Sequence, residues 1–132
     1  MFRRRGLPEQ LREPLDGLRS VVEEIEVAKD VMTSTVPTTR LPGTPLPDAL
    51  LALEEHLGRA KELMPTWRHP QVESEWRACD EGIDESLRRA TKLREEAPDL
   101  GGFEGLIWAV DLVLAPLEAF EAAAERFRTL RR

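Results

Sequence analysis

The sequence contains no tyrosine, one cysteine (Cys79) and two histidines, His56 and His69. A single cysteine excludes an internal disulfide, which suits a reducing compartment such as the cytoplasm. Two histidines are too few for a histidine-rich zinc site, and neither has the glutamate three residues before it that a di-iron bundle site uses. We therefore expect no cofactor, no metal site and a protein that is not an enzyme.

Long apolar runs are also missing. No stretch reaches the roughly 18 apolar residues that a membrane helix needs. Even the most apolar part, residues 105–120, contains Asp111, Pro116 and Glu118. The N-terminal residues MFRRRGLPEQ are basic, but no apolar segment follows them, so we do not expect a signal peptide. These absences predict a cytoplasmic protein without a membrane partner.

The residues that are abundant follow a helical pattern. Proline and glycine separate four segments whose apolar residues advance in steps of three and four. These segments run from about Pro8 or Pro14 to Ser34, from Pro47 to Met64, from Pro70 to Ala97 and from Gly102 to about Leu130. No segment alternates as a strand would. We predict an all-α fold, a four-helix antiparallel up-down-up-down bundle in which residues 1–132 form one domain.

Each predicted helix has one apolar stripe that should face the core. The stripe residues are Leu11, Leu15, Leu18, Val22, Ile25 and Met32 in the first segment; Leu46, Leu50, Leu53, Leu57, Ala60 and Met64 in the second; Val72, Trp76, Cys79, Ile83, Leu87, Ala90, Leu93 and Ala97 in the third; and Phe103, Leu106, Ile107, Val110, Val113, Leu114, Leu117, Phe120, Ala124 and Phe127 in the fourth.

The fourth segment has a second apolar stripe on its opposite side. Its members Trp108, Leu112, Ala115 and Ala119 follow steps of four, three and four. A helix in a monomeric bundle needs only one apolar face, and small alanines would allow two backbones to approach closely. This pattern predicts an interaction protein that forms a homodimer through its fourth helix.

The charges are divided between an acidic body and the two chain ends. The protein has a net charge of −6, but residues 1–12 and 126–132 hold eight arginines and one glutamate. In the predicted topology these ends meet at one end of the bundle, beside the turn between the second and third helices. The residues gathered there would be Arg3, Arg4, Arg5, Arg12, Trp67, Arg68, His69, Arg126, Arg128, Arg131 and Arg132.

This basic end has two interpretations. The arginines near the last turn complement the helix dipole, and the first residues are simply a soluble arm. Alternatively, the end binds an anionic partner, with arginine forks on phosphate or carboxylate and Trp67 as a stacking face. The partner would be an acidic protein, a phosphorylated group or nucleic acid, and nucleic acid is the weakest of the three because the acidic body would repel it. An adaptor of this kind is the alternative to the self-associating protein.

Two segments outside the helices carry further expectations. Residues 1–7 should form a flexible basic arm. Residues 35–46 form a proline-rich loop between the first two helices, which is either a stiff link across the bundle end or a recognition segment.

Three polar or reactive residues have structural explanations. Asp111 belongs to an acidic seam between the two apolar faces of the fourth helix, where it is either solvated or paired with Arg88, Arg89 or Arg94. Cys79 lies on a core stripe beside acidic residues, which disfavours a reactive thiol. His56 lies at the edge of the second helix's stripe, where a half-buried, hydrogen-bonded ring is expected.

Overall fold

The computed structural model describes residues 7–130. Within that range the chain is all-α and has no strand, so the predicted four-helix class is confirmed. The α-helices are α1 (Arg12–Thr33), α2 (Leu46–Leu63), α3 (Glu73–Glu96), α4 (Phe103–Leu114) and α5 (Ala119–Leu130). Single turns of 3-10 helix precede α1 (Glu9–Leu11), follow α2 (Met64–Trp67), precede α3 (Pro70–Val72) and join α4 to α5 (Ala115–Glu118).

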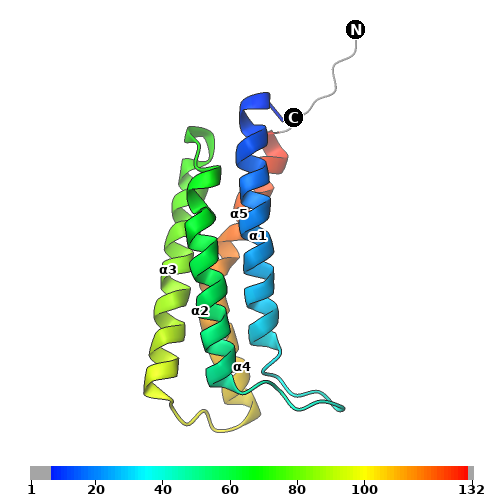
Figure 1. Ribbon diagram of the computed structural model, residues 1–132, viewed down its shortest axis with the longest axis vertical. Coiled ribbons are helices and arrows are strands. Elements are labelled where there is room, and N and C mark those ends of the chain that lie inside the picture. Colours follow the sequence, from blue (N-terminus) through cyan, green and yellow to red (C-terminus); the bar gives the residue numbers. More distant parts are fainter. Residues whose placement is uncertain (1–6, 131–132) are drawn as a thin grey trace.

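The helices pack side by side. α1, α2 and α3 alternate in direction, and α4 and α5 follow each other in one direction along the fourth position of the bundle (Figure 1). Polar contacts between helices agree with this arrangement. His56 Nδ1 lies 3.0 Å from Glu24 Oε2, which joins the middle of α1 to the middle of α2. Lys61, near the end of α2, binds Asp80 in the first half of α3. Glu54, in the middle of α2, binds Arg94 near the end of α3, with 2.8 Å between Arg94 Nε and Glu54 Oε2.

Prolines set the helix starts. Pro14 lies in the first turn of α1 and Pro47 is the second residue of α2, positions where no backbone N–H is needed. Pro70 begins a 3-10 turn instead, so α3 starts at Glu73, three residues after the predicted start. At the other end of α3, Ala97 adopts the left-handed conformation with φ 41°.

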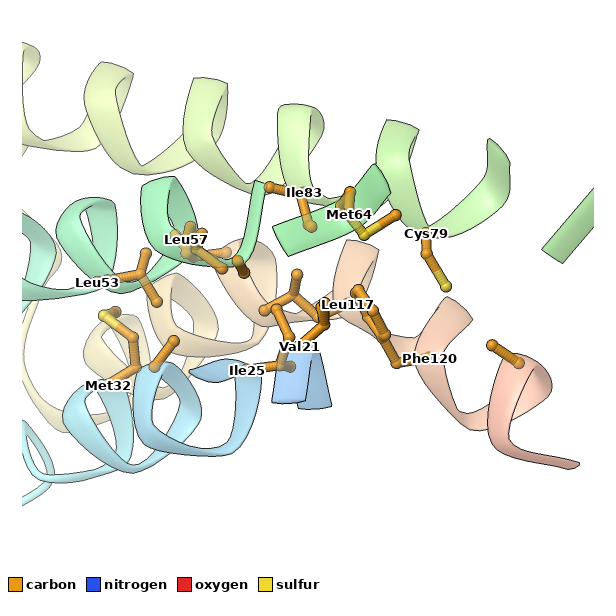
Figure 2. Packing of buried hydrophobic residues seen from close by; sticks show 14 of the residues in the cluster. Val21, Ile25, Met32, Leu53, Leu57, Met64, Cys79, Ile83, Leu117 and Phe120 are labelled. Carbon is orange, nitrogen blue, oxygen red and sulfur yellow. The ribbon is translucent and has the colours of Figure 1, made fainter. Parts of the chain in front are cut away.

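One hydrophobic cluster joins all five α-helices. Val21 and Ile25 of α1 lie near Leu117 and Phe120 of the last part of the chain (Figure 2). Most of the predicted stripe residues are buried, but Leu15 and Val22 are half-buried, whereas Val21 and Ala28 belong to the core. Ala97 and Phe103 are exposed, so their assignment to the core was wrong.

The predicted fourth helix is interrupted at Pro116, where a 3-10 turn separates α4 from α5. Proline has no N–H, so it cannot donate to the Leu112 carbonyl one turn earlier. Arg89 Nη1 of α3 donates to that carbonyl at 2.8 Å. Ser86 Oγ, which is fully buried, donates to the Val113 carbonyl at 2.7 Å. Side chains of α3 therefore compensate for the broken hydrogen-bond ladder.

Gly82 completes this contact. It lies one turn before Ser86 on α3, and a β-carbon added to it would be 2.3 Å from the Pro116 carbonyl oxygen. Only a glycine lets the two backbones approach this closely. The stripe Gly82, Ser86 and Arg89 thus fixes where the turn Ala115–Glu118 docks on α3.

The loop between α1 and α2 extends away from the bundle and folds back on itself (Figure 1). The Thr44 N–H donates to the Ser34 carbonyl at 2.8 Å, and the Thr38 N–H donates to the Leu41 carbonyl at 3.0 Å. Leu41 near the tip is 69% exposed. The loop links α1 to α2 by extending outward, and it does not cross the end of the bundle as expected (Figure 1). Its roles as a stiff link and as a recognition segment both stay predictions.

Candidate interaction surface

The most apolar α-helix, α4, is also poorly buried. Only Ala109, Val110 and Val113 are buried in it. Phe103 is 58% exposed and Trp108 is 57% exposed, and they are the two largest exposed apolar side chains among the described residues. A helix of this composition usually faces a core or a partner.

The residues predicted for self-association form the outer side of this helix and of its continuation. Trp108 and Ala115 are exposed, whereas Leu112 and Ala119 are half-buried. The structure therefore leaves the second apolar stripe largely open to solvent. Whether a second copy covers it stays a prediction.

A groove of about 670 Å³ runs between α3 and α4. Trp108 and Leu112 form one wall. The remaining lining residues come from α3 and from the connection to α4: Glu85, Arg88, Arg89, Lys92, Leu93, Glu96, Pro98, Asp99 and Leu100. The apolar stripe is thus continuous with a concave surface whose α3 wall carries three basic side chains, Arg88, Arg89 and Lys92, and two acidic ones, Glu85 and Glu96.

The arginines of α3 are engaged by partners other than Asp111. Arg88 and Arg89 both bind Glu85, and these hydrogen bonds, led by that of Arg88, hold the pKa of Glu85 below its usual range. Arg94 binds Glu54. The expected pairing of Asp111 with one of them was wrong, and the solvated alternative holds, because Asp111 is exposed and forms no ion pair with any residue from 7 to 130.

Lys92, on the α3 wall of the groove, also lacks an ionic partner in the described part of the chain. It is exposed, and none of the ion pairs formed among the described residues includes it. An available cation and an available anion therefore flank Trp108 and Leu112. The sequence pattern did not single out Lys92, because its position beside α4 depends on how α3 and α4 pack.

At the basic end, several of the predicted anion-binding residues already have partners within the chain. Arg68 Nε lies 2.7 Å from Glu73 Oε1, and its guanidinium stacks over the Trp76 ring at 4.1 Å from the centroid. Arg126 Nε lies 3.3 Å from Glu75 Oε1, and Arg128 pairs with Glu125. Such contacts reduce the charge available to an outside anion.

Trp67 has no exposed area and packs against Phe127, with 6.4 Å between the ring centroids, so the prediction that it offers a stacking face was wrong. His69 Nδ1 accepts a hydrogen bond from the Gln71 N–H at 3.1 Å, and Arg12 is exposed. The remaining members of the predicted site, Arg3, Arg4, Arg5, Arg131 and Arg132, lie outside the described residues, as does nearly all of the predicted arm 1–7.

The thiol of Cys79 and the imidazole of His56 both have structural contacts inside the bundle. Cys79 is buried, and burial together with the nearby Glu75 and Asp80 raises the pKa of its thiol to about 12. His56 is half-buried against Glu24. Among residues 7–130 no three histidine, cysteine or acidic side chains gather closely enough to hold a metal ion.

The helices of the described part of the chain are all too short or too polar to cross a membrane. Comparison with the models of known protein families, with curated proteins and with solved structures finds no match to this chain. The interaction surface on α4 is therefore the feature from which a function can be argued.

Proposed function

We propose that this protein is a self-associating helical-bundle interaction module, and that a second copy of the chain covers the exposed apolar side of α4. The observation that carries the proposal is the conflict between composition and burial in α4. The most apolar α-helix of the chain keeps Trp108 57% exposed.

The size of the effect suits a reversible dimer. A tryptophan side chain can bury up to about 250 Å², so covering the exposed part of Trp108 removes roughly 140 Å² from water. At about 25 cal/mol per Å², this contributes about 3.5 kcal/mol per copy. Association costs at least about 4 kcal/mol in lost freedom of motion. Two tryptophans together with Leu112 and Ala115 can therefore offset the cost, and we expect a concentration-dependent dimer.

A second copy is the preferred occupant because the surface is self-complementary in charge. Lys92 on one side of the apolar stripe and Asp111 on the other have no ionic partner within the described residues. A strongly acidic or strongly basic partner would meet one of them with the same sign of charge. A second copy offers each charge its opposite.

We also propose a non-catalytic role in the cytoplasm. The non-catalytic role is supported by the burial of Cys79, whose raised thiol pKa of about 12 keeps it protonated and unreactive. One cysteine suits a reducing compartment. The adaptor alternative is less well supported, because Arg68, Arg126 and Arg128 are held by glutamates of the same chain.

The test is solution mass across a concentration series, by light scattering or sedimentation. We expect the mass of the unaltered protein to rise toward that of a dimer, and Trp108→Glu to remain a monomer. Leu51→Glu is the matched control, because Leu51 is a 48% exposed apolar residue on the outer side of α2. It should dimerise as the unaltered protein does.

Intrinsic fluorescence gives a second readout. Trp67 and Trp76 are buried, so Trp108 dominates quenching by iodide or acrylamide. Quenching should decrease as the protein concentration rises. A protein that stays monomeric, with quenching independent of concentration, would overturn the proposal. The proposal would also be overturned if Leu51→Glu prevented dimerisation and Trp108→Glu did not.

A further inference from the structure

We infer that the two copies pack with their α4 helices parallel, around a two-fold axis along the bundle, so that Lys92 of each copy meets Asp111 of the other. The inference rests on the proposed dimer and specifies its geometry. It follows from the order of charged and apolar residues across the surface and from their heights along the helices.

The order across the surface comes from helix geometry. Trp108 and Leu112 line the groove toward α3. At about 100° per residue, Asp111 lies about 60° from Trp108 and about 100° from Leu112, in both cases on the side away from α3. Lys92 stands on the α3 wall of the groove. At the height of Lys92 and Asp111 the surface therefore has a cation on one side, the apolar stripe in the middle and an anion on the other side. The exposed acids Glu96 and Glu104 lie at least one helical turn nearer the start of α4.

Which charges face each other in the dimer depends on the direction of its two-fold axis. An axis parallel to α4 exchanges the two sides of the partner's surface and keeps the helix direction, so each cation faces an anion. An axis in the interface and perpendicular to α4 reverses the helix direction but keeps the sides. It would place Lys92 against Lys92 and Asp111 against Asp111. Like charges in contact disfavour that antiparallel arrangement.

The heights of the two groups also fit the parallel dimer, because an axis along the helices places equal heights opposite each other. Arg89 of α3 reaches the Leu112 carbonyl, so these residues mark one level of the bundle. α3 and α4 run in opposite directions, so Lys92 lies about 4.5 Å from that level toward the start of α4, and Asp111 lies about 1.5 Å from it in the same direction. The two charges are therefore within one helical turn of each other in height.

Arg88 adds positive charge to the same side. It is exposed, and its one ionic partner, Glu85, is on its own helix. Exposed pairs of this kind are weak and exchange readily. Arg88 can therefore contribute to the attraction toward Asp111 of the second copy without the loss of an interhelical contact.

Charge exchange tests the contact. Lys92→Glu and Asp111→Lys should each weaken the dimer about tenfold, because every dimer contains two such pairs and each change replaces attraction by repulsion. The double variant should return to within about threefold of the unaltered protein. Glu55→Lys is the control, because Glu55 is an exposed acid on α2 that forms no ion pair with the described residues. It should leave the dimer unchanged.

Crosslinking tests the direction of the helices. Glu104→Cys in the first turn of α4 and Ala115→Cys just after its end are single-cysteine additions at exposed positions, eleven residues and about 16 Å apart. In a parallel dimer each lies opposite itself, so a short bifunctional thiol reagent should join both variants into dimers. In an antiparallel dimer at least one of the two self-pairs is separated by about 16 Å or more. Native Cys79 is buried and gives no background.

The outcomes separate the two proposals. An unaltered protein that stays monomeric overturns both. A dimer in which the double variant is no better than the single variants, or in which only one cysteine position crosslinks, overturns the parallel geometry and leaves the proposed function standing. Rescue by the double variant, together with crosslinking at both positions, supports the inference.

Discussion

Replacement of Gly82 by alanine should destabilise the protein through its contact with the break in the last helical segment. The added methyl group would lie 2.3 Å from the Pro116 carbonyl oxygen, a backbone atom that cannot rotate away. α3 and the turn Ala115–Glu118 must therefore move apart. The movement also stretches the buried hydrogen bond from Ser86 Oγ to the Val113 carbonyl, now 2.7 Å.

The expected change in the free energy of unfolding is the cost of the crowded contact minus the gain from the better helix preference of alanine. Alanine is favoured over glycine inside a helix by about 1 kcal/mol. Overpacking typically costs about 1–3 kcal/mol, and a weakened buried hydrogen bond adds about 1 kcal/mol. We therefore expect Gly82→Ala to lower the free energy of unfolding by about 1–3 kcal/mol.

Gly58→Ala is a control within the same protein. Gly58 is in the middle of α2, and a β-carbon there would meet no atom within 4 Å. The helix preference should then act alone and raise the free energy of unfolding by about 0.5–1 kcal/mol. The two substitutions are chemically identical, yet they should shift stability in opposite directions.

The assay is urea unfolding followed by circular dichroism and by the fluorescence of the buried Trp67 and Trp76. One fixed protein concentration is used, because the proposed dimer would stabilise the folded state in a concentration-dependent way. In thermal scans each kcal/mol should move the midpoint by about 3–5 °C for a chain of this size. If Gly82→Ala were as stable as the unaltered protein, or gained as much as Gly58→Ala, the close packing of α3 on Pro116 would be refuted.

Two further changes have predictable signs. Ala97→Gly should raise the free energy of unfolding by about 0.5–1 kcal/mol, because φ at Ala97 is 41° and glycine adopts this conformation without strain. The control Ala122→Gly, at an exposed helical site in α5, should lower the free energy of unfolding by about as much. Urea midpoints of the two variants that move in the same direction would contradict this. Burial raises the pKa of the Cys79 thiol from 9.0 to about 12, so the thiol is neutral in both states below pH 9.0 and ionises only in the unfolded chain between pH 9.0 and about 12. Stability should fall with rising pH in that window, by up to about 1.4 kcal/mol per unit, and urea unfolding of Cys79→Ala should lack this part of the slope.

The parts of the fold that the sequence predicted are those governed by local rules. Regular spacing of leucine and proline near the helix starts placed α1 and α2 to within a few residues. The exact core face was less predictable. In α1 the pattern favoured Val22, whereas Val21 is buried, because neighbouring valines differ by only about 100° around the helix and packing against other helices selects between them.

The break at Pro116 was missed although proline is the strongest helix breaker. Apolar residues continue on both sides of it, so the periodicity predicted one uninterrupted helix. The break depends on α3, because Arg89 donates to the Leu112 carbonyl and Ser86 donates to the Val113 carbonyl, one turn before Pro116. Those donors precede the carbonyls that they reach by 23 residues for Arg89 and 27 residues for Ser86, and no local pattern connects them to Pro116.

The apolar residues of the candidate surface could be predicted from local spacing, whereas its charged residues on other helices could not. Helical spacing alone grouped Trp108, Leu112, Ala115 and Ala119, and these residues do lie on the outer side of the last helical segment. The charge partners could not be assigned in this way. Lys92 is on another helix, and the arginines expected to pair with Asp111 are held by Glu85 and Glu54.

The way α4 is held explains how an apolar helix can remain exposed. Hydrophobic burial alone would rotate α4 until its larger side chains, Trp108 among them, faced the core. The contacts at Pro116 oppose this rotation, because Gly82 admits the Pro116 carbonyl in one position only and Arg89 and Ser86 bind backbone atoms at fixed points. Weakening these contacts should therefore reduce dimerisation as well as stability. Gly82→Ala is expected to lower the affinity between copies without altering any residue of the exposed surface, and a destabilised variant that dimerises as strongly as the unaltered protein would show that α4 keeps its orientation by other means.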